Sequence, residues 1–376
     1  MRFLWAIALV LCACSTASGP EDSGGLDART AVDSGQAADA GAIEVDAAPG
    51  VDAEPSPDAM TVDAGAAADA MSLDVGGGTG DAAAPEAGTL VVVAVGYGNR
   101  RTSTFDGRQW GDDQVVDPSG GDDNNLLRGV GYAGGRFVAV GGGGQGQSWT
   151  SDDGRTWSNH VTALRAFLSD AVYGNGVWVA AGGNGLRLVS TDQAQSWHGD
   201  PGYYSGHFRG IAFGNGVFVA AGHRYGASND GLTAVSADGL SWQLREHNGL
   251  AGLSAITFGN GVFVALSLGG RLTVSTDGQQ WDEISLGSNS LNAPTVANGE
   301  ILVPASDGIW HSSDGRHYQF IAGFACGSIQ YAFGQYLGIT WESQRWTTTS
   351  LSSPWSRSVG NDGPAFTEIL SGLVAP

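Results

Sequence analysis

The stretch Ser275-Thr276-Asp277-Gly278-Gln279-Gln280-Trp281 recurs in degraded copies along this chain of 376 residues. Aligned on the last aromatic residue, the copies are TFDGRQW ending at Trp110, SDDGRTW at Trp157, STDQAQSW at Trp197, SADGLSW at Trp242, STDGQQW at Trp281, SSDGRHY at Tyr318 and TSLSSPW at Trp355. Successive copies are 47, 40, 45, 39, 37 and 37 residues apart. These seven copies and their spacing predict seven four-stranded propeller blades.

The residue types of the repeat indicate a tight hairpin turn. An Asp carboxylate accepts hydrogen bonds from backbone N–H groups one or two residues on, and the following Gly reaches positive φ without steric cost. The first Ser or Thr adds a hydroxyl, and the last Trp buries a ring beneath the turn. We therefore expect structural roles, and neither catalysis nor metal binding, for Asp106, Asp153, Asp192, Asp238, Asp277, Asp314, Trp110, Trp157, Trp197, Trp242 and Trp281. The last copy lacks the Asp, as a purely structural turn can.

The pattern S/T-x-D-(x)-G-x-x-W resembles the Asp-box, or BNR, repeat of sialidases, family 74 glucanases, sortilin-type receptors and the photosystem II assembly propeller. The resemblance covers the repeats. It implies that each turn lies on the outer rim of a propeller, between the third and fourth strands of a blade.

Each repeat has two readable strand segments before its turn, in the order strand, Asn-Gly turn, strand, loop, strand, turn, strand. In one repeat they are Phe208–Phe213 and Val217–Ala221, joined by Gly214-Asn215-Gly216. Asn-Gly between two apolar runs is a strong hairpin signal. The sequence thus predicts an all-β fold, a seven-bladed β-propeller over residues 89–376.

The two ends of this domain complement each other. The first repeat begins at a second strand, Val91–Gly96, and the last segment, Phe366–Ser371, has the pattern of a first strand. We expect the C-terminal strand to complete the first blade and close the ring, which removes exposed sheet edges. The aromatic residues predicted to pack between blades are Phe137, Trp178, Phe218, Phe263 and Tyr336. Cys326 is predicted to be a small buried hydrophobic residue.

The N-terminus is typical of a secretory signal over residues 1–14, with Arg2 followed by the apolar run Phe3–Ala13. Its end, Leu11-Cys12-Ala13-Cys14, resembles a bacterial lipobox, which implies lipidation of Cys14. Cys12 is the competing cysteine, but Leu11 is large for the cleavage position. An ordinary signal peptide cleaved near Ala17 is the alternative. Ser15 after the lipidated cysteine implies an outer-membrane lipoprotein, periplasmic or surface-exposed.

Residues 15–88 consist mostly of Ala, Asp, Gly and Pro, which predicts a disordered acidic linker. The linker has 15 of the 38 acidic residues and one Arg, and therefore a net charge of −14 of the chain's −21. The segment resembles the tethers of myxobacterial lipoproteins. All 17 basic residues are Arg, which excludes a lysine nucleophile.

Arginines gather in the loops between second and third strands and at the start of first strands. Such loops share one face of a propeller, and a guanidinium pairs bidentately with carboxylate or sulfate. With two aromatic residues that could stack on a sugar ring, the candidate ligand-binding residues are Arg100, Arg101, Arg128, Arg187, Arg209, Arg224, Arg271, Arg345, Tyr204 and Trp341. The alternative is that these arginines are ordinary solvated loop residues.

The sequence predicts no metal site and no cofactor. Its seven His residues form no His-x-x-His or Cys cluster, and His207 with His223 is a weak pair. The acidic loop Gly111–Asn125 suits a calcium ion or, more simply, a solvated loop.

Catalysis is the less favoured function. A sialidase-like mechanism could use Asp170 as the acid and Tyr203 or Tyr204 with Glu246, but the Arg-Ile-Pro motif of those enzymes is absent, and they typically have six blades. We assign no catalytic residue. The sequence favours a monomeric, lipid-anchored binding or scaffold module for an anionic glycan or protein, with no nucleic-acid partner. A sialidase-like glycoside hydrolase and an assembly factor for an envelope protein complex are the alternatives.

Overall fold

The computed structural model describes residues 88–375 except 120, 122, 162–164, 201–205, 227–229, 288–289 and 361–362. The chain divides into two compact units, Met1–Asp63 and Ala64–Pro376, and every described residue belongs to the second. The predicted signal sequence, Cys14, the linker up to residue 87 and Tyr204 lie outside the described residues.

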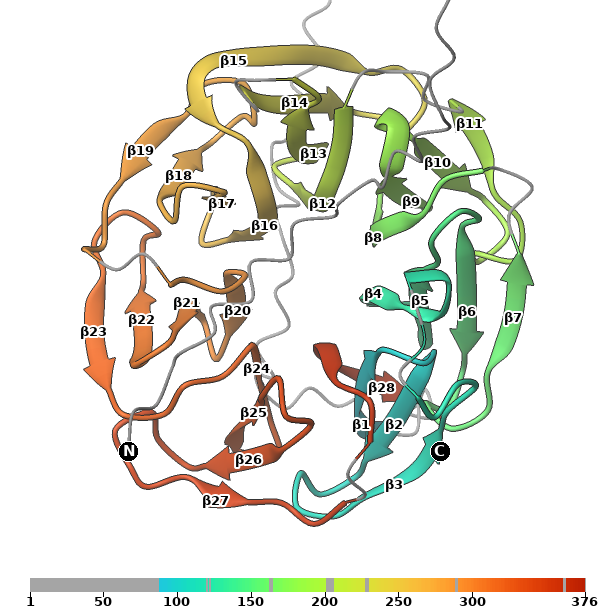
Figure 1. The fold of residues 1–376 in the computed structure, drawn as a ribbon, viewed down its shortest axis with the longest axis vertical. Coiled ribbons are helices and arrows are strands. Elements are labelled where there is room, and N and C mark those ends of the chain that lie inside the picture. The colour runs from blue at the N-terminus through green and yellow to red at the C-terminus, as the bar shows by residue number, and fades with distance from the viewer. Residues whose placement is uncertain are drawn as a thin grey trace, which may run out of the picture. The chain divides into compact units, whose positions relative to one another are not determined.

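The described residues form seven antiparallel sheets of four strands each, set around a ring (Figure 1). From the innermost strand outward, blade 1 consists of β28 (Phe366–Val374), β1 (Thr89–Gly96), β2 (Arg100–Thr104) and β3 (Trp110–Gln114), blade 2 of β4 (Leu127–Ala133), β5 (Arg136–Gly141), β6 (Gln147–Ser151) and β7 (Ser158–Val161), blade 3 of β8 (Leu168–Gly174), β9 (Val177–Gly182), β10 (Arg187–Ser190) and β11 (His198–Asp200), and blade 4 of β12 (Gly206–Gly214), β13 (Val217–Arg224), β14 (Asp230–Ser236) and β15 (Gln243–Ala251). Blade 5 consists of β16 (Leu253–Gly259), β17 (Val262–Ser267), β18 (Leu272–Ser275) and β19 (Asp282–Ile284), blade 6 of β20 (Thr295–Ala297), β21 (Glu300–Ala305), β22 (Gly308–Ser312) and β23 (Gln319–Ala322), and blade 7 of β24 (Ser328–Ala332), β25 (Gln335–Ile339), β26 (Arg345–Thr348) and β27 (Ser356–Arg357). The predicted seven-bladed propeller is confirmed.

The C-terminal strand closes the ring. β28 pairs with β1 in an antiparallel register that runs from Thr89 opposite Val374 to Gly96 opposite Phe366. Blade 1 is therefore built from both ends of the domain, as the sequence predicts. β28 thereby covers the inner edge of β1, which would otherwise be open to pairing with another chain.

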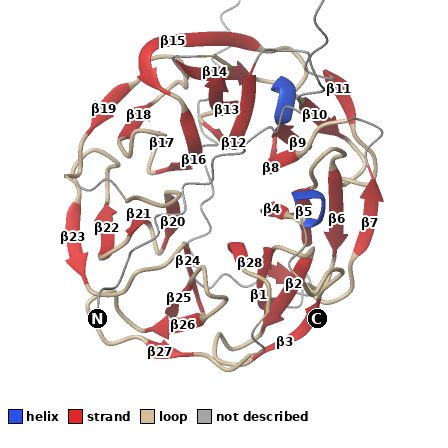
Figure 2. Ribbon diagram, in the orientation of Figure 1, coloured by secondary structure: helices blue, strands red, loops and turns tan. Residues whose placement is uncertain are grey.

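Helical structure is minor in the described part of the chain (Figure 2), where two 3₁₀ turns occur, η1 (Asp123–Asn125) and η2 (Gly183–Gly185). None of the described helices has the length and apolar character needed to cross a membrane.

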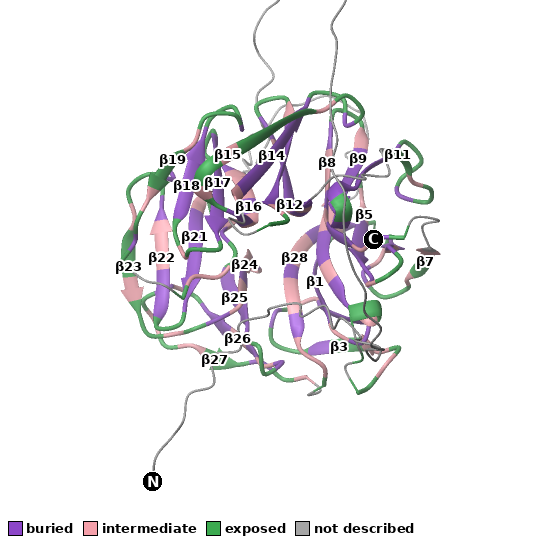
Figure 3. Ribbon diagram, turned by 45° about the horizontal axis from the view of Figure 1, so that its top comes forward, coloured by how far each residue is buried: buried purple, intermediate pink, exposed green. Residues whose placement is uncertain are grey.

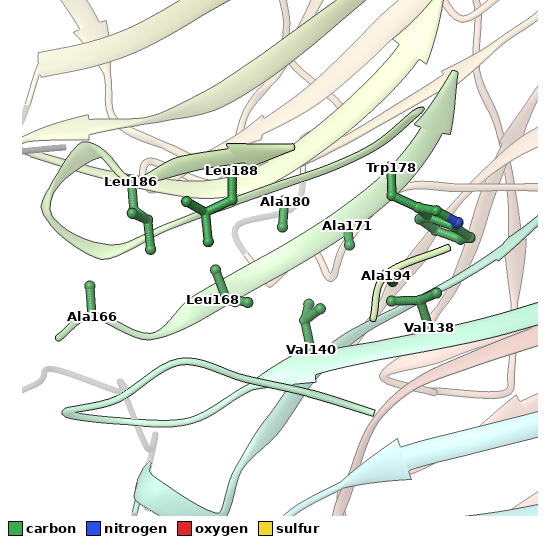
Figure 4. Packing of buried hydrophobic residues seen from close by; sticks show 10 residues of the cluster. All are labelled: Val138, Val140, Ala166, Leu168, Ala171, Trp178, Ala180, Leu186, Leu188 and Ala194. Atoms are coloured by element: carbon green, nitrogen blue, oxygen red, sulfur yellow. The ribbon is translucent and has the colours of Figure 1, made fainter. Parts of the chain in front are cut away.

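The core lies between neighbouring blades. In one cluster, Val138 and Val140 of blade 2 pack against Leu168, Trp178 and Leu188 of blade 3 (Figure 4). The middle strands of the blades are buried, whereas outer strands such as β15 and β19 are largely exposed (Figure 3). The predicted inter-blade residues are all buried, with Phe137, Phe218 and Phe263 at 0% exposure.

The turns between third and fourth strands have the expected hydrogen bonds. Oδ1 of Asp277 accepts the hydroxyl of Ser275 at 3.0 Å and the backbone N–H groups of Gln279 and Gln280 at 2.8 and 3.0 Å. Gly278 has φ of +71° and donates its N–H to Ser275 Oγ at 2.8 Å. The same pattern recurs at Asp106, Asp153, Asp238 and Asp314.

Candidate anion-binding site at the central cavity

The innermost strands share an irregularity that selects which side chains reach the centre of the ring. In five of them the register shifts by one residue near the start of the strand, and the extra residues are Arg128, Ser169, Arg209, Ser254 and Thr367. An extra residue of this kind is left out of the strand pairing, and its side chain is re-aimed.

Hydroxyls at the extra position bond to backbone. Ser169 Oγ donates to the carbonyl of Phe208 on the next blade at 2.8 Å, and Thr367 Oγ1 donates to that of Leu127 at 2.7 Å. The two arginines are too long for this role. Arg128 and Arg209 line a central cavity of about 470 Å³, together with these hydroxyl residues and with Asp170 and Glu368.

An aromatic cluster lies beside Arg128, and the charge of Arg209 acts on its two histidines. The guanidinium of Arg128 lies 4.7 Å from the ring centre of Phe167, which is 5.2 Å from the ring of His207. His207 in turn contacts His223, at 5.5 Å, and Tyr225, whose hydroxyl is 3.0 Å from Nδ1 of His207. We call Arg128, Phe167, His207, Arg209, His223 and Tyr225 the channel-mouth cluster.

The electrostatics of the cluster come from its arginines. Burial and the nearby charge of Arg209 lower the pKa of His223 to about 4, and burial, Arg209, His223 and Arg128 lower that of His207 to about 4. Both imidazoles are therefore neutral at neutral pH. The cluster combines guanidinium cations with uncharged rings, an arrangement that suits an anionic group attached to a flat or apolar body.

Two half-buried carboxylates line the same cavity. Asp170 accepts the N–H groups of Ala171 at 2.7 Å and Ile211 at 3.2 Å, and Glu368 accepts that of Val130 at 2.7 Å. Burial raises the pKa of Asp170 to about 7, and burial together with the charge of Asp170 raises that of Glu368. Both carboxylates thus bond to backbone groups, and Ile211 and Val130 belong to the next blade.

Four of the arginines predicted to bind ligand are inside the fold. They begin third strands, which are covered on both faces, and they are Arg100, Arg101, Arg187 and Arg345, with exposures of 0, 3, 4 and 3%. Arg100 forms a two-point ion pair with Asp113, and Arg101 lies 3.9 Å from the ring centre of Trp149. Their positions indicate structural roles.

The remaining predicted residues are dispersed. Arg224 pairs with Glu246 at 2.7 Å, Arg271 is exposed and pairs with Glu283, and Trp341 is 59% exposed in the loop before β26. Of the predicted set, Arg128 and Arg209 are the two that line the central cavity.

The acidic loop after β3 has protein partners. Asp113 bonds to Arg100, Asp112 lies 3.0 Å from Arg155, and Asp117 accepts the N–H and hydroxyl of Ser119. Among the described residues, no group of three or more His, Cys, Asp or Glu side chains is arranged to bind a metal ion. Cys326, just before β24, is buried, which raises the pKa of its thiol to about 12.

The residues considered for a sialidase-like reaction occupy different layers of their blades. Asp170 is on β8, an innermost strand, and bonds to backbone, whereas Glu246 is on β15, an outermost strand, and pairs with Arg224. Their arrangement gives Asp170 a structural function and leaves Glu246 in a surface ion pair.

Sequence reasoning missed Phe167 and Glu368. Glu368 could have been found, because Thr367-Glu368 aligns with Ser169-Asp170 in the repeat. Nothing in the sequence pairs Phe167 with Arg128, since the contact joins two blades.

No family model and no curated protein matches the chain. Among solved structures, it is similar to one described as YCF48 bound to D1 peptide, with 16% identity and a TM-score of 0.48 over 78% of this chain and 95% of that one. It is also similar to the computationally designed Ika8 protein, with 14% identity and a TM-score of 0.43 over 64% of this chain and 77% of that one. It is similar as well to the WD40 β-propeller domain of Doa1, with 13% identity and a TM-score of 0.46 over 63% of this chain and 84% of that one. At these identities the similarity concerns the fold alone.

Proposed function

We propose that the propeller is a binding module whose channel-mouth cluster captures an anionic group of a glycan or protein partner. The observation that supports this is the position of Arg128 and Arg209, which both line the central cavity beside aromatic rings. The proposal places the module in the cell envelope, attached through a lipid on Cys14 and separated from the membrane by the acidic linker.

The chemistry of the cluster favours a carboxylate or a sulfate. A guanidinium makes two parallel hydrogen bonds to such a group, and the low dielectric of a partly buried site strengthens them. Arg128 is about one-fifth exposed, so a ligand can reach it, and its pairing with Asp123 at 3.6 Å is loose. The neutral rings of His207 and Tyr225 provide a surface for the body of a sugar or an amino acid.

The test is binding of the full chain, carrying Cys14→Ser to remove the predicted lipidation site, to immobilised polygalacturonate, a sulfated polysaccharide and polyglutamate. We expect salt-sensitive binding to at least one of these probes. The double variant Arg128→Gln with Arg209→Gln should weaken it at least about tenfold, since each hydrogen bond to a charged group contributes about 1.5–3 kcal/mol.

The matched control is Arg108→Gln with Arg316→Gln, which removes the same charge from two exposed turns on the outer rim. This control should bind as the unaltered chain does. Equal weakening in both double variants would mean that binding depends on net charge alone and would contradict the proposal. Binding to polyglutamate but to neither polysaccharide would favour a protein partner and an assembly role.

A further inference from the structure

The junction between blades 6 and 7 differs from its neighbours at the turn between the first and second strands. At three junctions the Asn of an Asn-Gly turn donates its amide to two backbone carbonyls of the following blade, at 2.8 to 3.1 Å. The donors and acceptors are Asn175 to Gly216 and Ala237, Asn215 to Gly261 and Thr276, and Asn260 to Gly299 and Ser313. At the fourth, Asn298 donates instead to the hydroxyl of Tyr336 at 3.2 Å.

The last, degenerate turn of the chain lies at the same junction as Asn298. Thr348 ends β26 as Ser312 ends β22, so the turn begins one residue earlier than the sequence alignment places it. Thr348 Oγ1 donates to the backbone carbonyl of Ser350, whereas Ser312 Oγ donates to the carboxylate of Asp314. Ser350 then occupies the place of the aspartate and buried Leu351 the place of the glycine. The last turn therefore has no carboxylate at the position that Asp314 occupies in blade 6.

A cavity of about 280 Å³ opens at this junction. Glu300 and His311 of blade 6 line one side, and Tyr331 and Tyr336 of blade 7 line the other with the turn at Thr349 and Ser350. Nδ1 of His311 lies 3.3 Å from the carboxylate of Glu300. The two tyrosine rings meet edge to face, with 4.9 Å between their centres.

From this lining we infer that the junction of blades 6 and 7 binds one neutral sugar residue. The wall combines a carboxylate acceptor, an imidazole, an amide and several hydroxyls with two aromatic rings. Sugars need both kinds of partner, because their hydroxyls form hydrogen bonds and their C–H groups pack on aromatic rings. The volume is close to the lower end of small-molecule pockets, about 300 Å³, and suits one ring.

Other ligand classes fit less well. Among the described residues no arginine lines the cavity, and the carboxylate of Glu300 would repel an anion. A cation would have to displace His311 from Glu300. The inference does not depend on the proposed function, because the two sites share no residue and use different chemistry.

The test is titration of the full chain carrying Cys14→Ser with the methyl glycosides of glucose, galactose, mannose and N-acetylglucosamine, followed by NMR. We expect saturable, salt-insensitive binding of at least one glycoside. Glu300→Gln should weaken it about ten- to hundredfold, as expected for the loss of a charged hydrogen-bond acceptor. Thr349→Trp, which fills the cavity from an exposed position, should abolish it.

The control for Thr349→Trp is Thr276→Trp, the exposed threonine of the corresponding turn in blade 5, which should bind as the unaltered chain does. Arg128→Gln with Arg209→Gln should also leave neutral-sugar binding unchanged, which separates this site from the channel-mouth cluster. The inference is overturned if none of the four glycosides binds saturably, or if Thr349→Trp binds as well as Thr276→Trp.

Discussion

Asp170 on the innermost strand of blade 3 accepts the backbone N–H of Ile211 on the innermost strand of blade 4, with 3.2 Å between Oδ2 and N. Glu368 makes the same connection from blade 1 to Val130 of blade 2, at 2.7 Å. Gly129 makes room for Asp170, since a Cβ there would lie 2.9 Å from its Oδ1. Side-chain carboxylates thus link innermost strands that belong to different sheets.

Because the pKa values of these two carboxyl groups are raised, we predict that the protein loses stability as pH rises through the weakly acidic range. An acid whose pKa is higher in the folded than in the unfolded chain binds more protons when folded, so deprotonation favours unfolding. The pKa of Asp170 is raised to about 7 by burial, and that of Glu368 is raised by burial and by Asp170. We expect the free energy of unfolding to fall between about pH 4, the unfolded value, and about pH 7.

Urea denaturation across this pH range checks the prediction. Glu368→Gln keeps an acceptor for Val130 and removes one titrating group, so its unfolding free energy should depend less on pH. An unchanged pH dependence would contradict the assignment.

At lower pH the turn aspartates act in the opposite sense. Backbone hydrogen bonds lower the pKa of Asp238 to about 2, and its contribution is lost as the pH falls from about 4 through that value.

Gly174→Ala should destabilise the propeller by about 1–3 kcal/mol, the usual cost of overpacking. A Cβ at Gly174 on blade 3 would lie 2.3 Å from the ring of Phe213 on blade 4, so the ring would have to shift. Gly111→Ala is the matched control, because a Cβ at that position meets no heavy atom within 4 Å. The midpoint of urea unfolding should shift for the first variant and stay within error for the second.

Asp277→Ala should lower the free energy of unfolding by about 0.5–2 kcal/mol, by analogy with the loss of a helix-capping side chain that accepts backbone N–H groups. The carboxylate accepts the N–H groups of Gln279 and Gln280, and alanine leaves both without that acceptor. Thr276→Ala, at the exposed neighbouring position, should be nearly neutral. Calorimetry of the two variants measures the difference, and equal melting temperatures would refute a stabilising turn.

Arg187→Ala should affect stability, whereas Arg271→Ala should not. Arg187 is 4% exposed, and its guanidinium lies 5.7 and 5.8 Å from the ring centres of Phe208 and Trp242. Truncation of Arg187 should lower the free energy of unfolding by about 2–3 kcal/mol, because its packing contacts are lost and the polar groups that it contacts lose a partner. Arg271 is exposed and forms a surface ion pair of little energetic value. If Arg187→Ala is as stable as the unaltered chain but no longer binds anions, Arg187 is a ligand-binding residue and the structural role is wrong.

The contacts between blades were only partly predictable from the sequence. The buried aromatic of each second strand follows from its place in the repeat, as at Phe218. The sequence does not show that Phe213 and Phe258 on first strands pack on Gly174 and Gly214 of the preceding blade. Such contacts depend on the rotation between adjacent sheets, which local patterns do not encode.

Sequence periodicity by itself determined the number of blades, the order of strands and the closure of the ring by the C-terminal strand, because each is set by local turn chemistry and a repeated spacing. The repeat pattern also identified arginines in the loops and at the start of first strands as candidates for ligand binding. Only the tertiary structure decided which of them are accessible: Arg187 begins a third strand and is enclosed by its neighbours, whereas Arg128 occupies an extra position in an innermost strand and faces the central cavity. Burial is a property of the assembled ring, in which neighbouring blades cover or leave open each side chain.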